Sequence, residues 1–304
     1  MTMDFKNRVA IVTGAGGGLG RAHALLLAER GAKVVVNDLG GARTGDGHSI
    51  AAAAAVVEEI RAKGGEAIAN AASVTDYAQV EEMVAEAMAA WGRVDILINN
   101  AGILRDRTFA NMTLEDFRAV VDVHFWGSVH CTKAVWEQMR NQNYGRIVMT
   151  TSSSGLYGNF GQSAYGAAKM AVVGLMNTLH LEGQKYDIRV NCVAPSAATR
   201  MTEDIFSQEV MEMLTPDVVS PGVLALVSED APSRMIMCAG AGSFESAYVT
   251  LTEGYFAGTG HAAPERVLEN IDRIMDRTGE QVPQTGALQS EHEYNMLERS
   301  LART

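Results

Sequence analysis

The chain has 304 residues, of which 47% are hydrophobic and 20% are charged. These values are typical of a compact globular protein and exclude a disordered, collagen-like or disulfide-dense chain. With 25 Lys and Arg residues against 36 Asp and Glu residues, the net charge is −11, which excludes a general affinity for nucleic acid or anionic membranes.

The cysteines and the apolar runs indicate the cellular compartment in which we expect the protein. Cys131, Cys192 and Cys238 are far apart and lie in apolar stretches, so we expect neither a disulfide framework nor a metal site. No apolar run is long enough to span a membrane, and the polar start of the chain does not resemble a signal peptide. The sequence therefore predicts a cytoplasmic protein without a membrane partner.

In chain order, short runs rich in β-branched residues alternate with longer helical patterns. We predict strands at residues 9–13, 34–37, 96–99, 147–150 and 188–193, and helices at 21–30, 50–63, 77–91, 114–140 and 163–185. Parallel strands need crossover helices, which pack on both faces of the sheet. The pattern predicts an α/β fold with a Rossmann-type, doubly wound parallel sheet.

We expect the last third of the chain to contribute the final strands of the sheet and then a C-terminal extension outside it. Residues 199–217 lack a strand pattern and are rich in apolar side chains, which predicts a flexible lid over an apolar pocket; the candidates are Met201, Ile205, Phe206, Met211, Met213 and Leu214. A helix at 222–227, a core strand at 235–238 and an edge strand at 248–252 follow. Two amphipathic stretches come after residue 258. We expect a Rossmann domain at 1–254 and a C-terminal helical extension at 255–304, which caps the cleft or braces a second subunit.

A glycine-rich turn follows the first predicted strand. Gly14, Gly18 and Gly20 let the chain turn sharply and bring backbone N–H groups and a helix N-terminus toward a pyrophosphate. Asp38 ends the second strand, where a carboxylate accepts hydrogen bonds from ribose hydroxyls and repels a 2′-phosphate. This arrangement predicts a dinucleotide site that favours NAD over NADP.

Three side chains form a candidate catalytic group. Tyr165 and Lys169 are one helical turn apart and share a helix face. A neighbouring ammonium favours the phenolate of a tyrosine, which then serves as a proton acceptor while a hydride leaves. Ser152, at the end of the preceding strand, is placed to hold the substrate oxygen, although Ser153 and Ser154 carry the same hydroxyl.

Taken together, five motifs resemble the short-chain dehydrogenase/reductase family: Thr-Gly-x-x-x-Gly-x-Gly at 13–20, Asn-Asn-Ala-Gly at 99–102, Ser152, Tyr165-x-x-x-Lys169 and Asn-x-x-x-Pro at 191–195. The resemblance implies that Tyr165 and Lys169 also contact the cofactor. It implies the same for Leu19, Ser73, Val74, Asn100, Pro195 and Ala198. It further implies pairing through the two long helices, giving a homodimer or homotetramer.

Three further stretches, at residues 36–41, 101–107 and 157–162, resemble one subgroup of that family. The subgroup comprises the (3R)-hydroxyacyl-CoA dehydrogenase units of peroxisomal multifunctional enzymes and their bacterial stand-alone relatives. His124 stands where the wider family has an asparagine that supports a water chain to the lysine, and the subgroup shares this histidine. A satisfied core histidine is the other interpretation of this residue.

The resemblance implies an NAD-dependent enzyme that oxidises (3R)-3-hydroxyacyl-CoA, with Arg105, Arg107 and Arg200 as candidate contacts for the CoA phosphates. A 17β-hydroxysteroid dehydrogenase is the alternative. A catalytically silent dinucleotide-binding protein is a remote second alternative, because fold alone does not establish function. Asp38 opposes a reductase that depends on NADPH. The chain length predicts a stand-alone dehydrogenase.

Overall fold

The structure is a computed structural model that describes residues 3–42, 44–45, 47–198 and 208–302. It separates into two compact units, Met1–Ser246 and Ala247–Thr304. The boundary lies eight residues before the predicted one at 254/255. Each unit is described by itself below.

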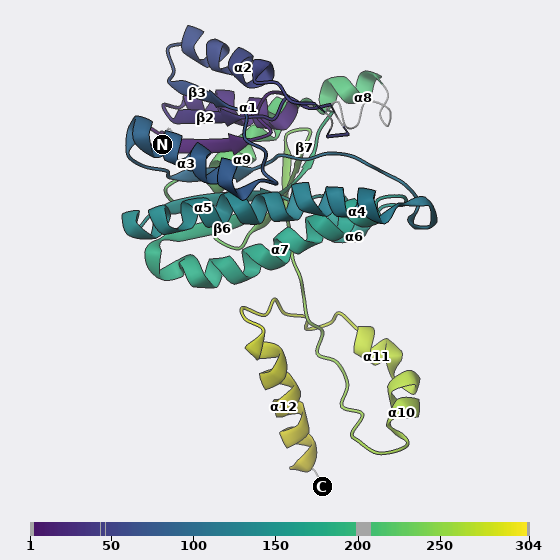
Figure 1. The fold of residues 1–304 in the computed structure, drawn as a ribbon. Helices are drawn as coiled ribbons and strands as arrows, with labels where there is room; N and C mark the ends of the chain where they lie inside the picture. Colours follow the sequence, from purple (N-terminus) through teal and green to yellow (C-terminus); the bar gives the residue numbers. More distant parts are fainter. Residues whose placement is uncertain (1–2, 43, 46, 199–207, 303–304) are drawn as a thin grey trace. The chain divides into compact units, whose positions relative to one another are not determined.

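The first unit is built on an 8-stranded sheet in the order β3-β2-β1-β4-β5-β6-β7-β8 (Figure 1). The strands are β1 Val9–Thr13, β2 Lys33–Asn37, β3 Ala67–Asn70, β4 Ile96–Asn99, β5 Gly145–Thr150, β6 Ile188–Ser196, β7 Ile236–Gly240 and β8 Ser243–Ala247. Strands β1 to β7 pair in parallel. The predicted doubly wound parallel sheet is confirmed.

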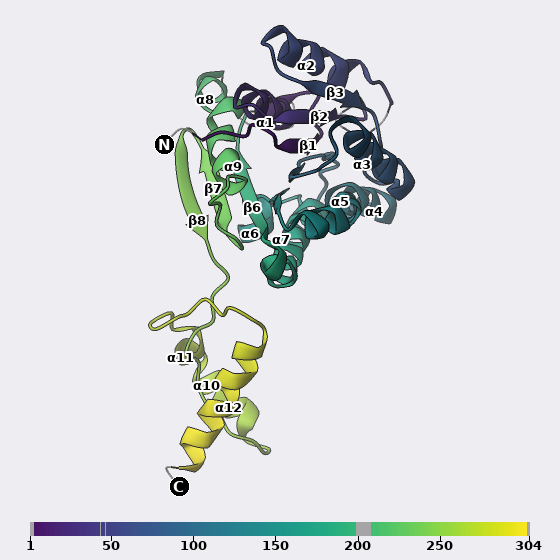
Figure 2. The same ribbon diagram turned by 90° about the vertical axis from the view of Figure 1, so that its left-hand side faces the viewer.

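Helices cover both faces of this sheet, as the two views in Figures 1 and 2 show. On one face α1 Gly18–Glu29 packs between α2 Ala51–Ala62 and α9 Ser220–Leu226. On the other, α3 Tyr77–Trp91 lies beside α5 Gly127–Gln142, and α4 Leu114–Val121 lies beside α7 Ser163–Gly183. The short helix α6 Ser153–Tyr157 packs on α7. Apolar side chains of the strands and of α1, α2 and α9 form a buried core between the layers.

The prediction and the structure differ at two strands. The prediction misses β3, because Ala67 and Ala69 give this short strand little β-branched character. The predicted edge strand at 248–252 is wrong: the edge strand is β8, which follows β7 through a two-residue turn. Ala241 and Gly242 in that turn have φ angles of 50° and 77°, as a tight hairpin requires, so the chain reverses earlier than expected.

The helix predicted over 114–140 is present but not regular. Residues Asp122–Trp126 between α4 and α5 form a π-helical turn. Such a turn accommodates an extra residue and is frequent at functional sites. It places His124 beside the loop that follows β4, where the ring contacts Ile103.

The second unit contains α10 Ala263–Glu269, α11 Ile271–Met275 and α12 Ala287–Leu301. Leu251 and Gln281 exchange backbone hydrogen bonds of 2.9 and 3.0 Å, which join the first part of this unit to the segment before α12. No described side chain between residues 247 and 302 is buried. Its role as a cap or a brace remains a prediction. Among the described residues, no helix has the length and apolar character needed to cross a membrane.

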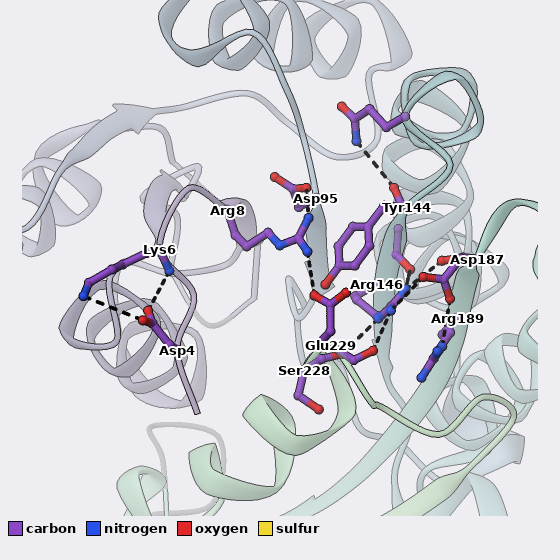
Figure 3. A network of polar contacts seen from close by, with 12 residues as sticks. Asp4, Lys6, Arg8, Asp95, Tyr144, Arg146, Asp187, Arg189, Ser228 and Glu229 are labelled. Atoms are coloured by element: carbon purple, nitrogen blue, oxygen red, sulfur yellow. Dashed lines mark hydrogen bonds and ion pairs between the residues drawn. The ribbon is translucent and has the colours of Figure 1, made fainter. Parts of the chain in front are cut away.

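A polar network lies at the amino-terminal ends of the strands, opposite the edge that carries the predicted site (Figure 3). Arg146 at the start of β5 is fully buried. Its guanidinium donates to the carbonyls of Asp187, Ser228 and Glu229 at 2.7 to 2.9 Å and to the Asp187 carboxylate at 3.1 Å. The ring of Tyr144 lies 4.1 Å from the Arg146 guanidinium carbon. One buried cation therefore joins three chain segments, at residues 144–146, 187 and 228–229.

We expect Arg146→Met to lower the free energy of unfolding by about 3 kcal/mol, because buried carbonyls lose their donors while the new side chain fills the same space. Chemical denaturation measures this change. Lys63→Ala, which removes an exposed ion pair with Glu59, is the control and should change stability by less than about 0.5 kcal/mol. Since Arg146 is remote from the predicted site, kcat of the folded variant should stay at the wild-type value. An unchanged stability would contradict the role assigned to the network.

Candidate active site

A cleft of about 460 Å³ opens at the carboxyl ends of β1, β2 and β4, where the strand order reverses. In open α/β sheets, this is the place where ligands bind. The predicted cofactor-binding residues that line the cleft are Gly14, Gly18, Leu19, Asp38, Ser73, Val74 and Asn100. The cleft thus brings together residues from four separate stretches of the sequence.

The glycine-rich turn at residues 14–20 fits a pyrophosphate. Gly14 has a φ of 64°, and a Cβ added there would lie 2.8 Å from the Cα of Ala101. A Cβ on Gly20 would press on the carbonyl oxygen of Gly14. Side chains are therefore excluded at both positions, and the backbone with the N-terminus of α1 is left facing the cleft.

The Asp38 carboxylate is fixed at the end of β2. Its Oδ2 accepts a hydrogen bond from the Gly16 backbone N–H at 2.7 Å, and its Oδ1 accepts one from the Gly40 backbone N–H at 2.7 Å. The site therefore presents a negative charge beside the loop that fits a pyrophosphate.

Asn100 links β4 to the same turn. Its side-chain amide donates to the carbonyls of Thr13 and Gly14 at 3.0 and 3.1 Å. On the far wall, Ser73 and the buried Val74 follow β3, and the Val74 carbonyl lies 2.9 Å from His130 Nδ1. These contacts hold the two walls of the cleft in place.

Sequence reasoning missed one wall of the cleft, formed by Leu39, Gly41, Ala42 and Gly45. Gly45 packs close to Ile103, and Arg105 donates from Nε to the Thr44 carbonyl at 3.1 Å. Arg105 also pairs with Asp116 at 2.8 Å and lines the cleft. Its contact with CoA phosphates stays a prediction. Arg107 is exposed, and Arg200 lies outside the described residues.

The predicted catalytic side chains meet at the end of β5. Ser152 caps the N-terminus of α6 and hydrogen bonds with Tyr165 on α7. Lys169 Nζ lies 5.5 Å from the centre of the Tyr165 ring and donates to the Thr150 carbonyl at 2.6 Å. The serine, tyrosine and lysine are thus neighbours, although they come from two elements.

Burial shifts the pKa values of Tyr165 and Lys169. It raises the pKa of Tyr165, the hydrogen bond with Ser152 lowers that pKa, and the Asp106 carboxylate raises it. Burial also lowers the pKa of Lys169 to about 7. Lys169 therefore loses its proton at a lower pH than an exposed lysine does.

His124 is buried against Tyr165 in an edge-on contact, with ring centres 5.1 Å apart. Burial, followed by the Lys169 charge, lowers its pKa to about 3, so the ring is neutral at physiological pH. Nε2 lies 2.7 Å from the Ile103 carbonyl oxygen and 3.2 Å from the Ile103 backbone nitrogen. Nδ1 has no hydrogen-bond partner within the described part of the chain.

Five further predicted cofactor residues are not part of the cleft lining: Gly20, Tyr165, Lys169, Pro195 and Ala198. Pro195 belongs to the end of β6, and Ala198 follows it, with its N–H donating to the Leu214 carbonyl at 2.6 Å. Of the expected lid, Met201, Ile205 and Phe206 lie outside the described residues. The part that follows forms the helix α8 Gln208–Met213.

A second cavity, of about 600 Å³, lies at the far ends of α5 and α7. It is lined by Trp136, Arg140, Leu181, Glu182, Gln184, Lys185 and Tyr186. It contains none of the predicted catalytic or cofactor-binding residues.

Comparison with protein families identifies the chain. Residues 8–210 match the family described as short chain dehydrogenase. The chain belongs to the short-chain dehydrogenase/reductase family. It is an oxidoreductase with the Rossmann-type fold of that family, as the motifs at the ends of β1, β4 and β5 predict.

This dehydrogenase/reductase resembles peroxisomal multifunctional enzymes, as expected from its sequence. It is 48% identical over 275 residues to peroxisomal multifunctional enzyme A of Dictyostelium discoideum, covering 90% of this chain and 61% of that protein. It superposes with a TM-score of 0.81 and 36% identity on the full-length peroxisomal multifunctional enzyme type 2 of Drosophila melanogaster. That match covers 98% of this chain and 50% of the Drosophila chain, so the dehydrogenase/reductase spans only part of these relatives.

A solved hydroxysteroid dehydrogenase is also similar. The 7α-hydroxysteroid dehydrogenase in complex with NADH and 7-oxo-glycochenodeoxycholic acid matches with a TM-score of 0.71 and 29% identity. The match covers 79% of this chain and 95% of that chain.

Proposed function

We propose that the chain is an NAD-dependent dehydrogenase that oxidises (3R)-3-hydroxyacyl-CoA to 3-oxoacyl-CoA. The observation that carries this proposal is the meeting of Ser152, Tyr165 and Lys169 beside a cleft that fits a dinucleotide. The similarity to peroxisomal multifunctional enzymes supports the thioester substrate.

The proposed roles follow from the positions of the side chains. Ser152 holds the substrate hydroxyl, and the Tyr165 phenolate removes its proton. Lys169 stabilises this phenolate by its charge. The bound NAD⁺ supplies the acceptor for the hydride that leaves the carbinol carbon. The products are therefore a ketone, NADH and one proton.

His124 is proposed to take the place of the relay asparagine that the family resemblance implies. Its ring is neutral and lies within reach of the Lys169 charge, and its Nδ1 has no hydrogen-bond partner among the described residues. A water molecule between these groups would carry protons from the lysine. Pro195 and Ala198 are proposed to close on the nicotinamide side of the cleft, and Leu19, Ser73, Val74 and Asn100 on the remainder of the cofactor.

NAD is proposed over NADP because the fixed carboxylate of Asp38 opposes a 2′-phosphate. The solved relative bound to NADH supports a nicotinamide dinucleotide. We also propose a homodimer or homotetramer that pairs through α5 and α7, and a cytoplasmic location.

The substrate assignment is tested by following the absorbance of reduced nicotinamide. The purified chain is given NAD or NADP with a (3R)-3-hydroxyacyl-CoA, its (3S) enantiomer, or a 17β-hydroxysteroid. We expect the highest kcat/KM with NAD and the (3R)-thioester. Turnover of the steroid alone would favour the steroid dehydrogenase, for which the similarity to 7α-hydroxysteroid dehydrogenase is the supporting observation. Bound NAD with no turnover of any substrate would favour a silent binding protein.

A further inference from the structure

Gln162 lies immediately before α7, the helix that carries Tyr165 and Lys169, and its side-chain amide reaches two other segments. Its Nε2 donates to the Asp106 carboxylate at 2.6 Å. Its Oε1 accepts from the Ser154 hydroxyl at 2.6 Å. Asp106 belongs to the loop after β4 and Ser154 to α6, so one amide joins three segments at the catalytic edge of the sheet. The mechanism proposed above uses none of these contacts.

Backbone hydrogen bonds also join the loop after β4 to the segment that begins α7. Arg107 and Gln162 form an isolated parallel bridge, and the Arg107 N–H donates to the Gly161 carbonyl at 3.0 Å. The Gln162 carbonyl in turn accepts from the Gly166 N–H at 2.7 Å, within the first turn of α7. The loop after β4 is therefore held in register with the start of the catalytic helix.

Each partner of the Gln162 amide also acts on a proposed catalytic hydroxyl: Ser154 on that of Ser152, and Asp106 on that of Tyr165. The Ser154 backbone N–H donates to Ser152 Oγ at 3.2 Å, so Ser154 connects Gln162 with the predicted catalytic serine. The Asp106 carboxylate acts on Tyr165 by charge repulsion. A shift of the Gln162 side chain would thus alter the surroundings of Ser152 and Tyr165 together.

We propose that Gln162 is a positioning residue, whose amide holds the Asp106 carboxylate and Ser154 at fixed places relative to the hydroxyls of Tyr165 and Ser152. The proposal rests on the proposed function, because it takes Tyr165 as the proton acceptor. Four groups face Tyr165: Ser152 by a hydrogen bond, Lys169 from its own helix, neutral His124 from the π-helical turn and Asp106 from the loop after β4.

Two variants separate the hydrogen bonds from the charge. Gln162→Glu keeps the size of the side chain and its acceptor for Ser154, but it cannot donate to Asp106 and repels that carboxylate. Asp106→Asn keeps an oxygen that accepts from Gln162 and removes only the charge. Gln184→Glu makes the same chemical change as the first variant at an exposed site beyond the other end of α7 and is the control.

We expect Gln162→Glu to lower kcat by about 10- to 100-fold, because the reacting groups are displaced, while the Kd for NAD is unchanged. Asp106→Asn should keep kcat at its alkaline plateau within about threefold. Its rate of oxidation should rise at lower pH than in the wild type, because removal of a nearby negative charge stabilises the phenolate. Gln184→Glu should match the wild type in both respects.

A measurement without substrate keeps this test separate from the substrate assignment. The chain has eight tyrosines, and NMR of protein labelled at tyrosine Cζ identifies Tyr165 by the signal lost in Tyr165→Phe. We expect the Tyr165 signal to titrate at lower pH in Asp106→Asn. An unchanged titration, or a Gln162→Glu variant with wild-type kcat, would overturn the proposal even if the natural substrate proves to be a steroid. A Gln162→Glu variant that only loses thermal stability, with wild-type kcat and pH profile, would do the same.

Discussion

Replacement of Tyr165 by Phe is expected to lower kcat for alcohol oxidation by about 10³-fold, because the variant lacks the only proposed proton acceptor. The ring remains and continues to pack edge-on against His124, so the fold should be retained. NAD binding should stay within about threefold of the wild type, because the cleft at residues 14–20 and Asp38 is untouched. Steady-state kinetics and titration calorimetry measure the two quantities.

The pH dependence provides a second result for the same variant. Oxidation requires the phenolate of Tyr165, and burial raises the pKa of this group, so the wild-type rate should increase as the pH rises above neutral. The residual rate of Tyr165→Phe should lack this increase. Tyr186→Phe, which changes a tyrosine just beyond the other end of α7, is the matched control and should behave as the wild type. Normal turnover by Tyr165→Phe would refute the proposed mechanism.

Asp38→Asn is expected to shift the preference for NAD over NADP, expressed as the ratio of kcat/KM values, by about 100-fold toward NADP. The amide keeps the shape of the side chain but removes the negative charge at the cleft wall. Binding of NAD weakens because a charged acceptor for ribose hydroxyls is lost. Binding of NADP improves because its 2′-phosphate no longer meets a carboxylate. Initial rates with each cofactor at saturating substrate measure the change.

Asp230→Asn removes a charge from an exposed position and is the control for the change in net charge. It should leave the cofactor ratio as in the wild type. The ratio itself corrects for any partial loss of folded protein, since both cofactors are tested on one preparation. A constant ratio in Asp38→Asn would show that another group, such as Arg105 in the same cleft, sets the cofactor preference.

The sequence predicts regular elements best where local pattern and burial agree. The strands at residues 9–13 and 96–99 match β1 and β4 because their side chains are buried on both faces and form continuous apolar runs. The edge strands β3 and β8 were missed or misplaced because edge positions bury less surface, and their sequences carry a weaker pattern. The same reasoning explains why the helix over 114–140 was predicted without its π-helical turn: the helical periodicity continues on both sides of His124.

The sequence by itself determined the family and the doubly wound sheet and predicted the core of the candidate site, because each of these is encoded in short motifs of fixed spacing. Only the tertiary structure decided how distant segments meet. It directed Arg105 toward Thr44 and Asp116 in the cofactor cleft, and it joined Gln162 to Asp106 and Ser154. Such contacts depend on which loops the parallel strands bring to one edge of the sheet and on the exact paths of those loops, so local residue patterns do not specify them.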